Sequence, residues 1–132
     1  MPKTQAGKTH PKILIVEDDA FLIGIYATKL ELEGFTVIQA KDGEAGLKAA
    51  QKELPDIVLL DILMPKLDGF QVLETLKKDP KTKKIPVVLL SNLGQKEDVE
   101  RGQALGATDY LIKAHFVPSE TVQKIKKILK IN

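Results

Sequence analysis

The sequence contains no cysteine and no tryptophan. Without cysteine the chain can form neither a disulfide framework nor a thiolate metal site, and a reducing cytosol is the natural setting. Long apolar runs are also missing, since charge, glycine or proline interrupts each run within about eight residues, whereas a membrane span needs roughly 20. These absences predict a cytoplasmic protein without membrane contact.

A large charge of one sign is absent as well. Twenty basic and eighteen acidic side chains leave a formal net charge of +2, far from the strongly basic composition of a nucleic-acid binder. We therefore expect protein partners and no direct binding of nucleic acid. One local cluster of lysines flanks Asp79-Pro80, and we interpret it as a solvated loop. Its members are Lys77, Lys78, Lys81, Lys83 and Lys84.

The length of 132 residues suits one domain. Residues 1–11 are small and polar and have no apolar run that could serve as a signal peptide, so we expect a disordered tail. Residues 12–132 would then form the single domain.

Within that domain, five short apolar runs alternate with five segments of helical period. The expected strands are Lys12–Val16, Thr36–Ala40, Asp56–Leu60, Val87–Leu90 and Asp109–Ile112. The expected helices are Ala20–Glu33, Glu44–Glu53, Gly69–Lys78, Lys96–Leu105 and Pro118–Ile131. This alternation is typical of an α/β protein with a parallel sheet covered on both faces. It predicts a (βα)5 order and an open, doubly wound sheet.

In such sheets ligands bind outside the carboxyl ends of the strands. Polar residues stand at four of those ends: Glu17, Asp18 and Asp19 after the first, Asp61 at the third, Ser91 at the fourth and Lys113 at the fifth. Gathered carboxylates repel one another unless a cation relieves them, and Mg²⁺ favours oxygen ligands. We therefore expect Asp18 and Asp61 to bind Mg²⁺, and Asp19 to cap the following helix.

Asp61 lies between two apolar segments, at the rim of the core, where a carboxylate could act as a nucleophile. Attack on phosphorus would give an aspartyl phosphate, helped by positive charge from Mg²⁺ and Lys113. Ser91 could hydrogen-bond a phosphoryl oxygen, but taken alone it could equally cap its strand. Taken alone, Lys113 could simply extend to solvent. Only the combination indicates phosphoryl chemistry.

From Lys12 to Leu129 the chain resembles the receiver domains of bacterial response regulators, of the single-domain type. The matching residues are the acidic pair Glu17-Asp18, the phosphoacceptor Asp61 within Leu59–Pro65, the turn glycine Gly69, the hydroxyl residue Ser91, the switch aromatic Tyr110 and the lysine Lys113. The resemblance implies a flavodoxin-like, five-stranded sheet in the order 2-1-3-4-5.

The resemblance also implies a function. Mg²⁺ would be held by Glu17, Asp18, Asp61 and the backbone carbonyl of Leu63, and the donor would be a sensor histidine kinase or a phosphotransfer protein. Phosphorylation would draw Ser91 and Tyr110 inward and alter the face formed by the fourth helix, fifth strand and fifth helix. The chain would catalyse only its own phosphorylation and dephosphorylation. Because no output domain follows Asn132, the expected readout is an unknown downstream protein.

Two further expectations concern the first helix and the last loop. The first helix carries more apolar surface than the sheet can cover, from Phe21, Ile23, Ile25 and Tyr26. We therefore expect Ile23 to face outward, and the family resemblance implies that it contacts the kinase. The family usually has proline after its lysine, whereas Lys113 precedes Ala114 and His115, so we expect a trans peptide there. Asn92 also departs from the small residue usual after the hydroxyl residue.

Three other functions fit less well. A phosphatase of the haloacid-dehalogenase type would have a second aspartate two residues after Asp61, where this chain has Leu63. A flavin carrier would need a phosphate loop after the first strand, where Glu17, Asp18 and Asp19 would repel phosphate. A receiver that is never phosphorylated should have lost at least one of the matched residues, and all are present.

Overall fold

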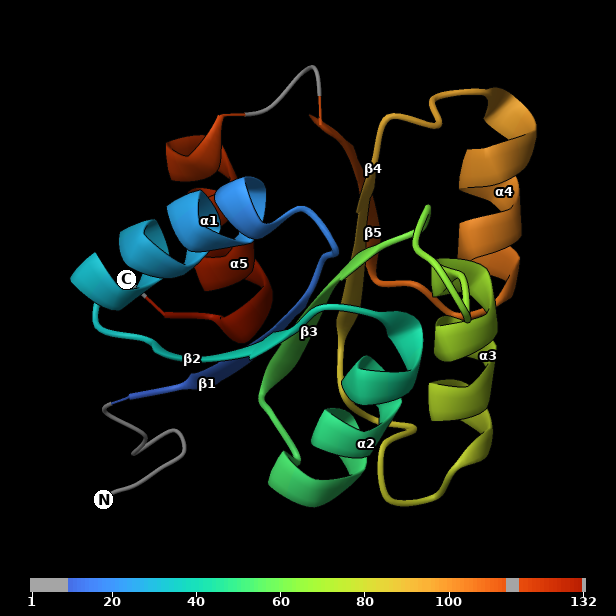
Figure 1. The fold of residues 1–132 in the computed structure, drawn as a ribbon, viewed down its shortest axis with the longest axis horizontal. Coiled ribbons are helices and arrows are strands. Elements are labelled where there is room, and N and C mark those ends of the chain that lie inside the picture. The colour runs from blue at the N-terminus through green and yellow to red at the C-terminus, as the bar shows by residue number, and fades with distance from the viewer. Residues whose placement is uncertain (1–9, 114–116, 132) are drawn as a thin grey trace.

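The computed structural model describes residues 10–113 and 117–131, which form a parallel sheet between two layers of helices (Figure 1). The strands are β1 (Lys12–Val16), β2 (Thr36–Ala40), β3 (Ile57–Asp61), β4 (Val87–Ser91) and β5 (Asp109–Ile112). The helices are α1 (Ala20–Leu32), α2 (Gly43–Glu53), α3 (Gly69–Lys78), α4 (Lys96–Ala104) and α5 (Pro118–Leu129). The strand order β2-β1-β3-β4-β5 confirms the predicted fold.

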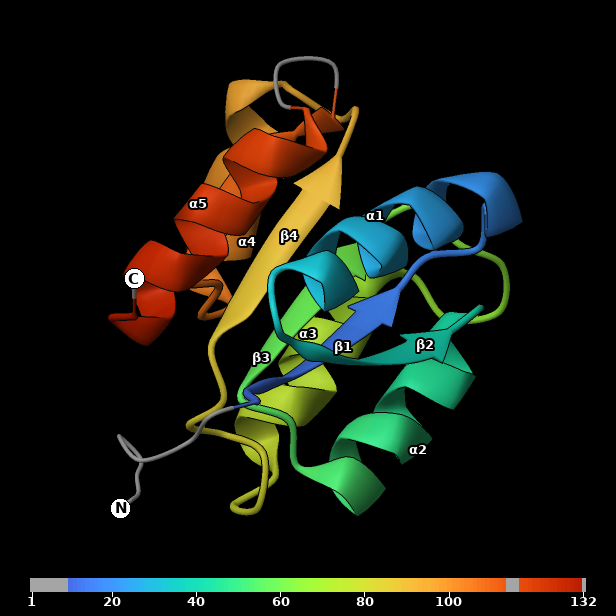
Figure 2. The same cartoon turned by 90° about the vertical axis from the view of Figure 1, so that its left-hand side faces the viewer.

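The two faces of the sheet carry two separate hydrophobic cores, because successive residues of a strand point to opposite sides. Ile13, Ile15 and Leu59 belong to the core under α1 and α5, and Leu14 and Leu60 belong to the core under α2 and α3. Figures 1 and 2 show α1 and α5 on one side of the sheet and α2, α3 and α4 on the other. Burial on both sides explains why the central strands are continuous apolar runs.

The bounds of β1, β2, β5 and α3 match the predictions, and those of the other elements differ from them by one or two residues. β3 includes Asp61 and β4 includes Ser91 as their last residues, so both polar side chains are held by the sheet itself. Gly34 and Gly106 follow α1 and α4 with φ of 96° and 100°, a conformation that glycine adopts without a steric penalty.

The prediction for Ile23 is wrong. Ile23 is only 2% exposed and packs into the core with Tyr26 and Leu30, which lie three and seven residues further along α1 and share its inner face. The outward apolar residues of α1 are Phe21 and Leu32, both 78% exposed, and Ile25, which is 37% exposed. The composition of α1 correctly indicated that some apolar surface faces outward, but Ile23 is not one of the residues that form it.

The lysine cluster is also not uniformly solvated. Lys77 is half-buried, and its Nζ donates to the carbonyl oxygens of Lys83 at 3.1 Å and Ile85 at 2.7 Å. Burial lowers the pKa of Lys77 below its ordinary value. This lysine ties the end of α3 to the segment before β4.

At the amino terminus, residues 1–9 of the predicted tail lie outside the described residues. Pro11 is buried, and its carbonyl oxygen accepts the backbone N–H of Thr36 at 2.9 Å. Among the helices of residues 10–113 and 117–131, none has the length and hydropathy of a membrane span.

Candidate functional site

The sheet register brings the polar strand ends together. Val16 pairs with Leu60 across β1 and β3, Asp61 pairs with Leu90 across β3 and β4, and Ser91 pairs with Ile112 across β4 and β5. Glu17, which follows Val16, and Lys113, which follows Ile112, therefore lie at the same edge as Asp61. The predicted convergence of these side chains follows from parallel pairing alone.

Three carboxylates form a cluster at this edge. One oxygen from each of Glu17, Asp18 and Asp61 lies within 4.8 Å of the others. Glu17 is 4% exposed and Asp61 is 5% exposed, whereas Asp18 faces solvent. Burial of two carboxylates so close together is costly unless cations or hydrogen bonds compensate them.

Lys113 supplies part of that compensation. Its Nζ lies 2.7 Å from Oε1 of Glu17 and 3.2 Å from Oδ2 of Asp61. Burial works against the charged ammonium, but the hydrogen bond and charge of Glu17 and the charge of Asp61 outweigh it and raise the pKa of Lys113. Lys113 is therefore not a lysine that extends to solvent.

Asp19 has a different role from its acidic neighbours. Its Oδ1 accepts the backbone N–H groups of Phe21 at 3.0 Å and Leu22 at 3.1 Å, which satisfies the first turn of α1 as predicted. Its own N–H donates to Oε2 of Glu17 at 3.0 Å. Glu17 is thus fixed from both sides, by Lys113 through one oxygen and by the backbone through the other.

The donor set fits a hard divalent cation. The cluster consists only of carboxylate oxygens, and the three carboxylates with the single ammonium of Lys113 leave two uncompensated negative charges among these four side chains. Oxygen ligands at an exposed edge, with Asp18 open to water, suit the partly hydrated coordination of Mg²⁺. Leu63 lies on the loop after β3 with its side chain 59% exposed, and its carbonyl ligand role stays a prediction.

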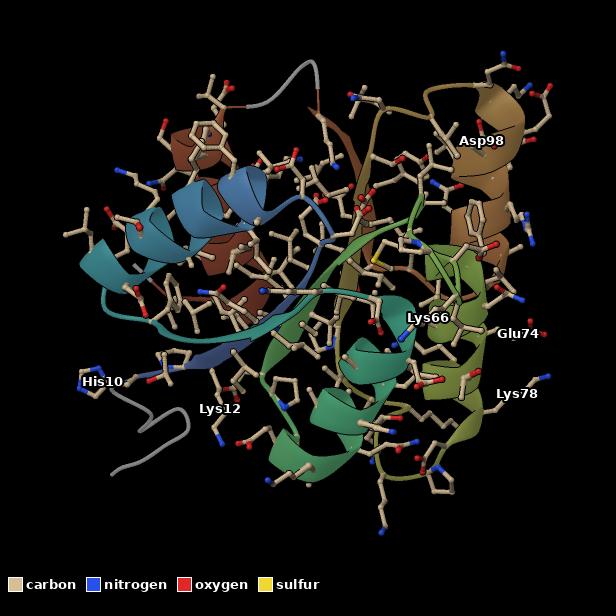
Figure 3. All side chains as sticks on the ribbon, in the orientation of Figure 1. His10, Lys12, Lys66, Glu74, Lys78 and Asp98 are labelled. Carbon is tan, nitrogen blue, oxygen red and sulfur yellow. The ribbon has the colours of Figure 1, made fainter. Side chains whose placement is uncertain are left out.

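The loop after β3 returns to the end of the strand, where Gly69 packs against the backbone of Asp61 and Ile62. The N–H of Gly69 donates to the carbonyl oxygen of Ile62 at 2.8 Å, and a β-carbon at Gly69 would overlap the carbonyl oxygen of Asp61. Lys66 adopts φ of 71° within this loop, and its Nζ lies 3.6 Å from Oδ2 of Asp42 beside α2 (Figure 3). Only glycine fits the close approach at position 69.

Ser91 and Tyr110 meet next to this site. Ser91 is 1% exposed, and its Oγ accepts the N–H of Leu93 at 3.2 Å, so it caps its strand. The Tyr110 hydroxyl donates to the carbonyl oxygen of Leu93. Burial and the charges of Asp98 and Asp61 raise the pKa of Tyr110 more than a hydrogen bond with Ser91 lowers it. Both side chains therefore point toward the loop between β4 and α4.

Two contacts near the site were not predicted from the sequence. Leu93 contributes through its backbone atoms, which leave no trace in side-chain chemistry. Arg101 lies over the ring of Phe70, 4.2 Å from the centroid, a contact between α3 and α4 that residue spacing cannot reveal. Ala114 and His115, and with them the expected trans peptide, lie outside the described residues.

Comparison with known proteins gives a consistent result. Residues 13–126 match the family model of the response regulator receiver domain. The chain is 41% identical over 123 residues to the probable transcriptional regulator ycf27 of Guillardia theta, covering 93% of this chain and 47% of that protein. It is 39% identical over 120 residues to the DNA-binding dual master transcriptional regulator RpaA of Synechocystis, covering 91% and 49%. The solved structure of the chemotaxis response regulator CheY4 of Vibrio cholerae superimposes with a TM-score of 0.85 at 28% identity, covering 91% of this chain and 99% of that one.

These relatives correct the predicted partners. The chain spans about half the length of the curated relatives it matches, and these are transcriptional regulators, one of them DNA-binding by name. The expectation of protein partners without nucleic acid is therefore wrong. A net charge of +2 describes only the portion shared with those regulators, and the position of Asn132 does not define what the readout must be.

Proposed function

Since the chain belongs to the response regulator receiver domain family, we propose that it is a phosphorylation-dependent switch in two-component signalling that accepts a phosphoryl group on Asp61. The observation that carries the proposal is the place of Asp61, buried at the end of β3, 3.2 Å from the Lys113 ammonium and clustered with Glu17 and Asp18. The donor would be a phosphohistidine on a sensor histidine kinase or a phosphotransfer protein.

In the transfer, a carboxylate oxygen of Asp61 forms a bond to phosphorus while the bond from phosphorus to the donor nitrogen breaks. Charge develops on the phosphoryl oxygens, and Lys113 is placed to neutralise part of it. Ser91 can accept from Leu93 and still donate its hydroxyl proton to a phosphoryl oxygen, because a hydroxyl can do both.

Glu17, Asp18, Asp61 and the Leu63 carbonyl would hold Mg²⁺. When bound, the ion would supply positive charge to the phosphoryl oxygens, which reduces their repulsion by the acidic cluster. The same set of residues would support loss of the phosphoryl group to water, so the chain would catalyse its own phosphorylation and dephosphorylation. A cytoplasmic location, expected from the missing cysteines, belongs to this proposal.

The outer side of α1 would receive the donor protein. Phe21, Ile25 and Leu32 line an apolar groove along this helix, and α1 begins directly after Asp18 and Asp19. Because the groove starts next to the acidic cluster, a helix lying along it could bring a phosphohistidine to Asp61. An exposed apolar surface of this kind is typical of a protein contact.

Labelling with acetyl phosphate tests the proposal without a kinase. With Mg²⁺ the wild-type protein should gain the mass of one phosphoryl group, and Asp61→Asn should gain none. Asp19→Asn is the matched control, because asparagine caps a helix as well as aspartate does, and it should be labelled like the wild type. Labelling of Asp61→Asn at the wild-type rate would contradict the proposal.

A further inference from the structure

Helix α4 is attached to the sheet at one small residue. Of its nine residues, all within the described part of the chain, only Gly102 is buried. The rest of the helix is mainly polar, and in Figure 1 it stands beside α3 at the β4 and β5 end of the sheet. The position of α4 therefore depends on how closely Gly102 approaches the strands.

That approach leaves no room for a side chain. A β-carbon placed on Gly102 would lie 2.7 Å from Cδ1 of Leu89 and 3.3 Å from Cδ2 of Tyr110. Leu89 is 0% exposed in the middle of β4, whereas Tyr110 is half-buried. The Tyr110 ring thus lies against α4 at the one point where the helix has no side chain.

We propose that Gly102 is a positioning residue for the Tyr110 switch: its missing side chain is what admits the Tyr110 ring beneath α4. The inference rests on the proposed phosphorylation switch in one respect, because it takes Tyr110 as the switch aromatic that the sequence resemblance implies. A larger residue at position 102 would favour the outward position of the Tyr110 ring whether or not Asp61 is phosphorylated. The conformation of the face formed by α4, β5 and α5 would then no longer follow the phosphorylation of Asp61.

The surroundings indicate which group would move. Leu89 is enclosed in a close-packed core and has little space to shift. Outward movement of α4 would pull Arg101 away from the Phe70 ring, 4.2 Å from its guanidinium carbon. Tyr110 is half-buried and is held at its hydroxyl by a hydrogen bond to the Leu93 carbonyl, so its ring can turn toward solvent. The overlap with Leu89 at 2.7 Å forces a small shift there in any case, and the Tyr110 ring, at 3.3 Å and with a path to solvent, is the second group that must give way.

The small number of aromatic residues makes the test direct. The chain has two tyrosines and no tryptophan, so protein labelled with 3-fluorotyrosine gives two ¹⁹F resonances, which Tyr110→Phe assigns. Without any phosphoryl donor, Gly102→Ala should shift the Tyr110 resonance toward its position in the urea-unfolded protein and leave the Tyr26 resonance in place. An unshifted Tyr110 resonance would overturn the inference.

Gly24→Ala is the matched control. Gly24 is also a glycine inside a helix, but a β-carbon there meets none of the described atoms within 4 Å. This variant should raise the melting temperature, because alanine is the better helix former, and leave the Tyr110 resonance where the wild type has it. A shift in both variants would show that any glycine replacement perturbs the ring, which would also overturn the inference.

A double-mutant cycle gives an independent measure. If Gly102→Ala acts through the Tyr110 ring, it should lower the melting temperature less in a Tyr110→Ala background than in the wild type. Equal losses in both backgrounds would assign the collision to Leu89 and refute the role of Tyr110. Neither measurement uses acetyl phosphate, so failure of Asp61 labelling would count against the proposed function alone.

Discussion

Lys113 places its ammonium between Glu17 and Asp61, two carboxylates that are almost completely buried. Each of the three side chains therefore depends on the others: without the cation, two neighbouring negative charges would stay in a region with little water. The same arrangement that would prepare Asp61 for the proposed phosphoryl chemistry also contributes to folding. The strength of this contribution depends on the protonation of Lys113.

We predict that Lys113→Met lowers the free energy of unfolding by about 1–3 kcal/mol at neutral pH. The pKa of Lys113 is raised on folding, so its contribution is complete below its ordinary pKa of about 10.4 and is lost as the pH rises through the higher folded value. Urea unfolding should show a difference in the free energy of unfolding between wild type and variant at neutral pH, and a smaller difference above about pH 11.

Lys78→Met is the control for this measurement. Lys78 lies 3.2 Å from Glu74, but both side chains are at least half exposed and point away from the sheet on α3 (Figure 3). An exposed pair contributes little, so this variant should match the wild type within about 0.5 kcal/mol. A gap for Lys113→Met that stays constant or widens at high pH would contradict the assigned role of Lys113.

Mg²⁺ should stabilise the protein through Asp18. At a Mg²⁺ concentration of about ten times the dissociation constant, binding to the folded state adds about 1.4 kcal/mol to the free energy of unfolding. Asp18→Asn should lose this response and, without Mg²⁺, should be at least as stable as the wild type, because one of three clustered negative charges is gone. Thermal unfolding with and without Mg²⁺ measures both effects.

Asp19→Asn should respond to Mg²⁺ as the wild type does, since Asp19 serves as the cap of α1. If Asp18→Asn and the wild type gain equally from Mg²⁺, the ion binds elsewhere.

Among the elements, α2 shows local backbone strain. The helix is capped by the next residue, Leu54, which adopts φ of 46° and ψ of 62° and is 49% exposed. A side chain in this left-handed conformation is disfavoured, and here it gains little burial in return. Leu54→Gly should therefore raise the free energy of unfolding by about 0.5–1 kcal/mol, measured by urea unfolding.

Gly34→Ala should have the opposite effect, because Gly34 already occupies φ of 96° at the end of α1. A loss of stability in Leu54→Gly would show that its exposed side chain contributes more to packing than its conformation costs.

Helix α1 separates two kinds of apolar residue on opposite faces. Phe21→Glu and Ile25→Glu should each slow phosphotransfer from the donor protein by about tenfold or more, as for a central contact residue, while labelling by acetyl phosphate continues. Rates from both donors, measured side by side, separate docking from chemistry. Equal slowing with both donors would place these residues in the reaction rather than in the contact.

Ile23→Glu provides the contrast. A carboxylate at this buried position costs several kcal/mol, so both phosphorylation reactions should fail together with folding.

At the scale of the whole molecule, the sheet was the most predictable part. Continuous apolar runs such as Ile57–Leu60 can only be central strands in a βα alternation, and parallel pairing then places Glu17, Asp61 and Lys113 at one edge. The inner faces of the helices were less predictable. In α1, apolar residues occur on all sides of the helix, so the period of 3.6 residues per turn does not show which side faces the sheet, and Ile23 was assigned to the wrong side.

Contacts through main-chain atoms and missing side chains could not be predicted. The contact with the Leu93 carbonyl and the close approach of Gly102 to Leu89 and Tyr110 become visible only when α4 and β5 are placed in three dimensions. The class of partner could not be predicted either. The match to RpaA covers 49% of that regulator, and the composition of this chain carries no information on the part of RpaA outside the match.

The phosphorylation of Asp61 is tested most directly by locating the phosphoryl group on the chain. Protein treated with acetyl phosphate and Mg²⁺ is reduced with borohydride, which converts an aspartyl phosphate to homoserine, and the peptides are sequenced by tandem mass spectrometry. If Asp61 is the phosphoacceptor, homoserine should appear at position 61 alone, with Asp56 and Asp68 unchanged. Homoserine at position 18 or 19, or a phosphoryl label that resists reduction, would contradict this assignment.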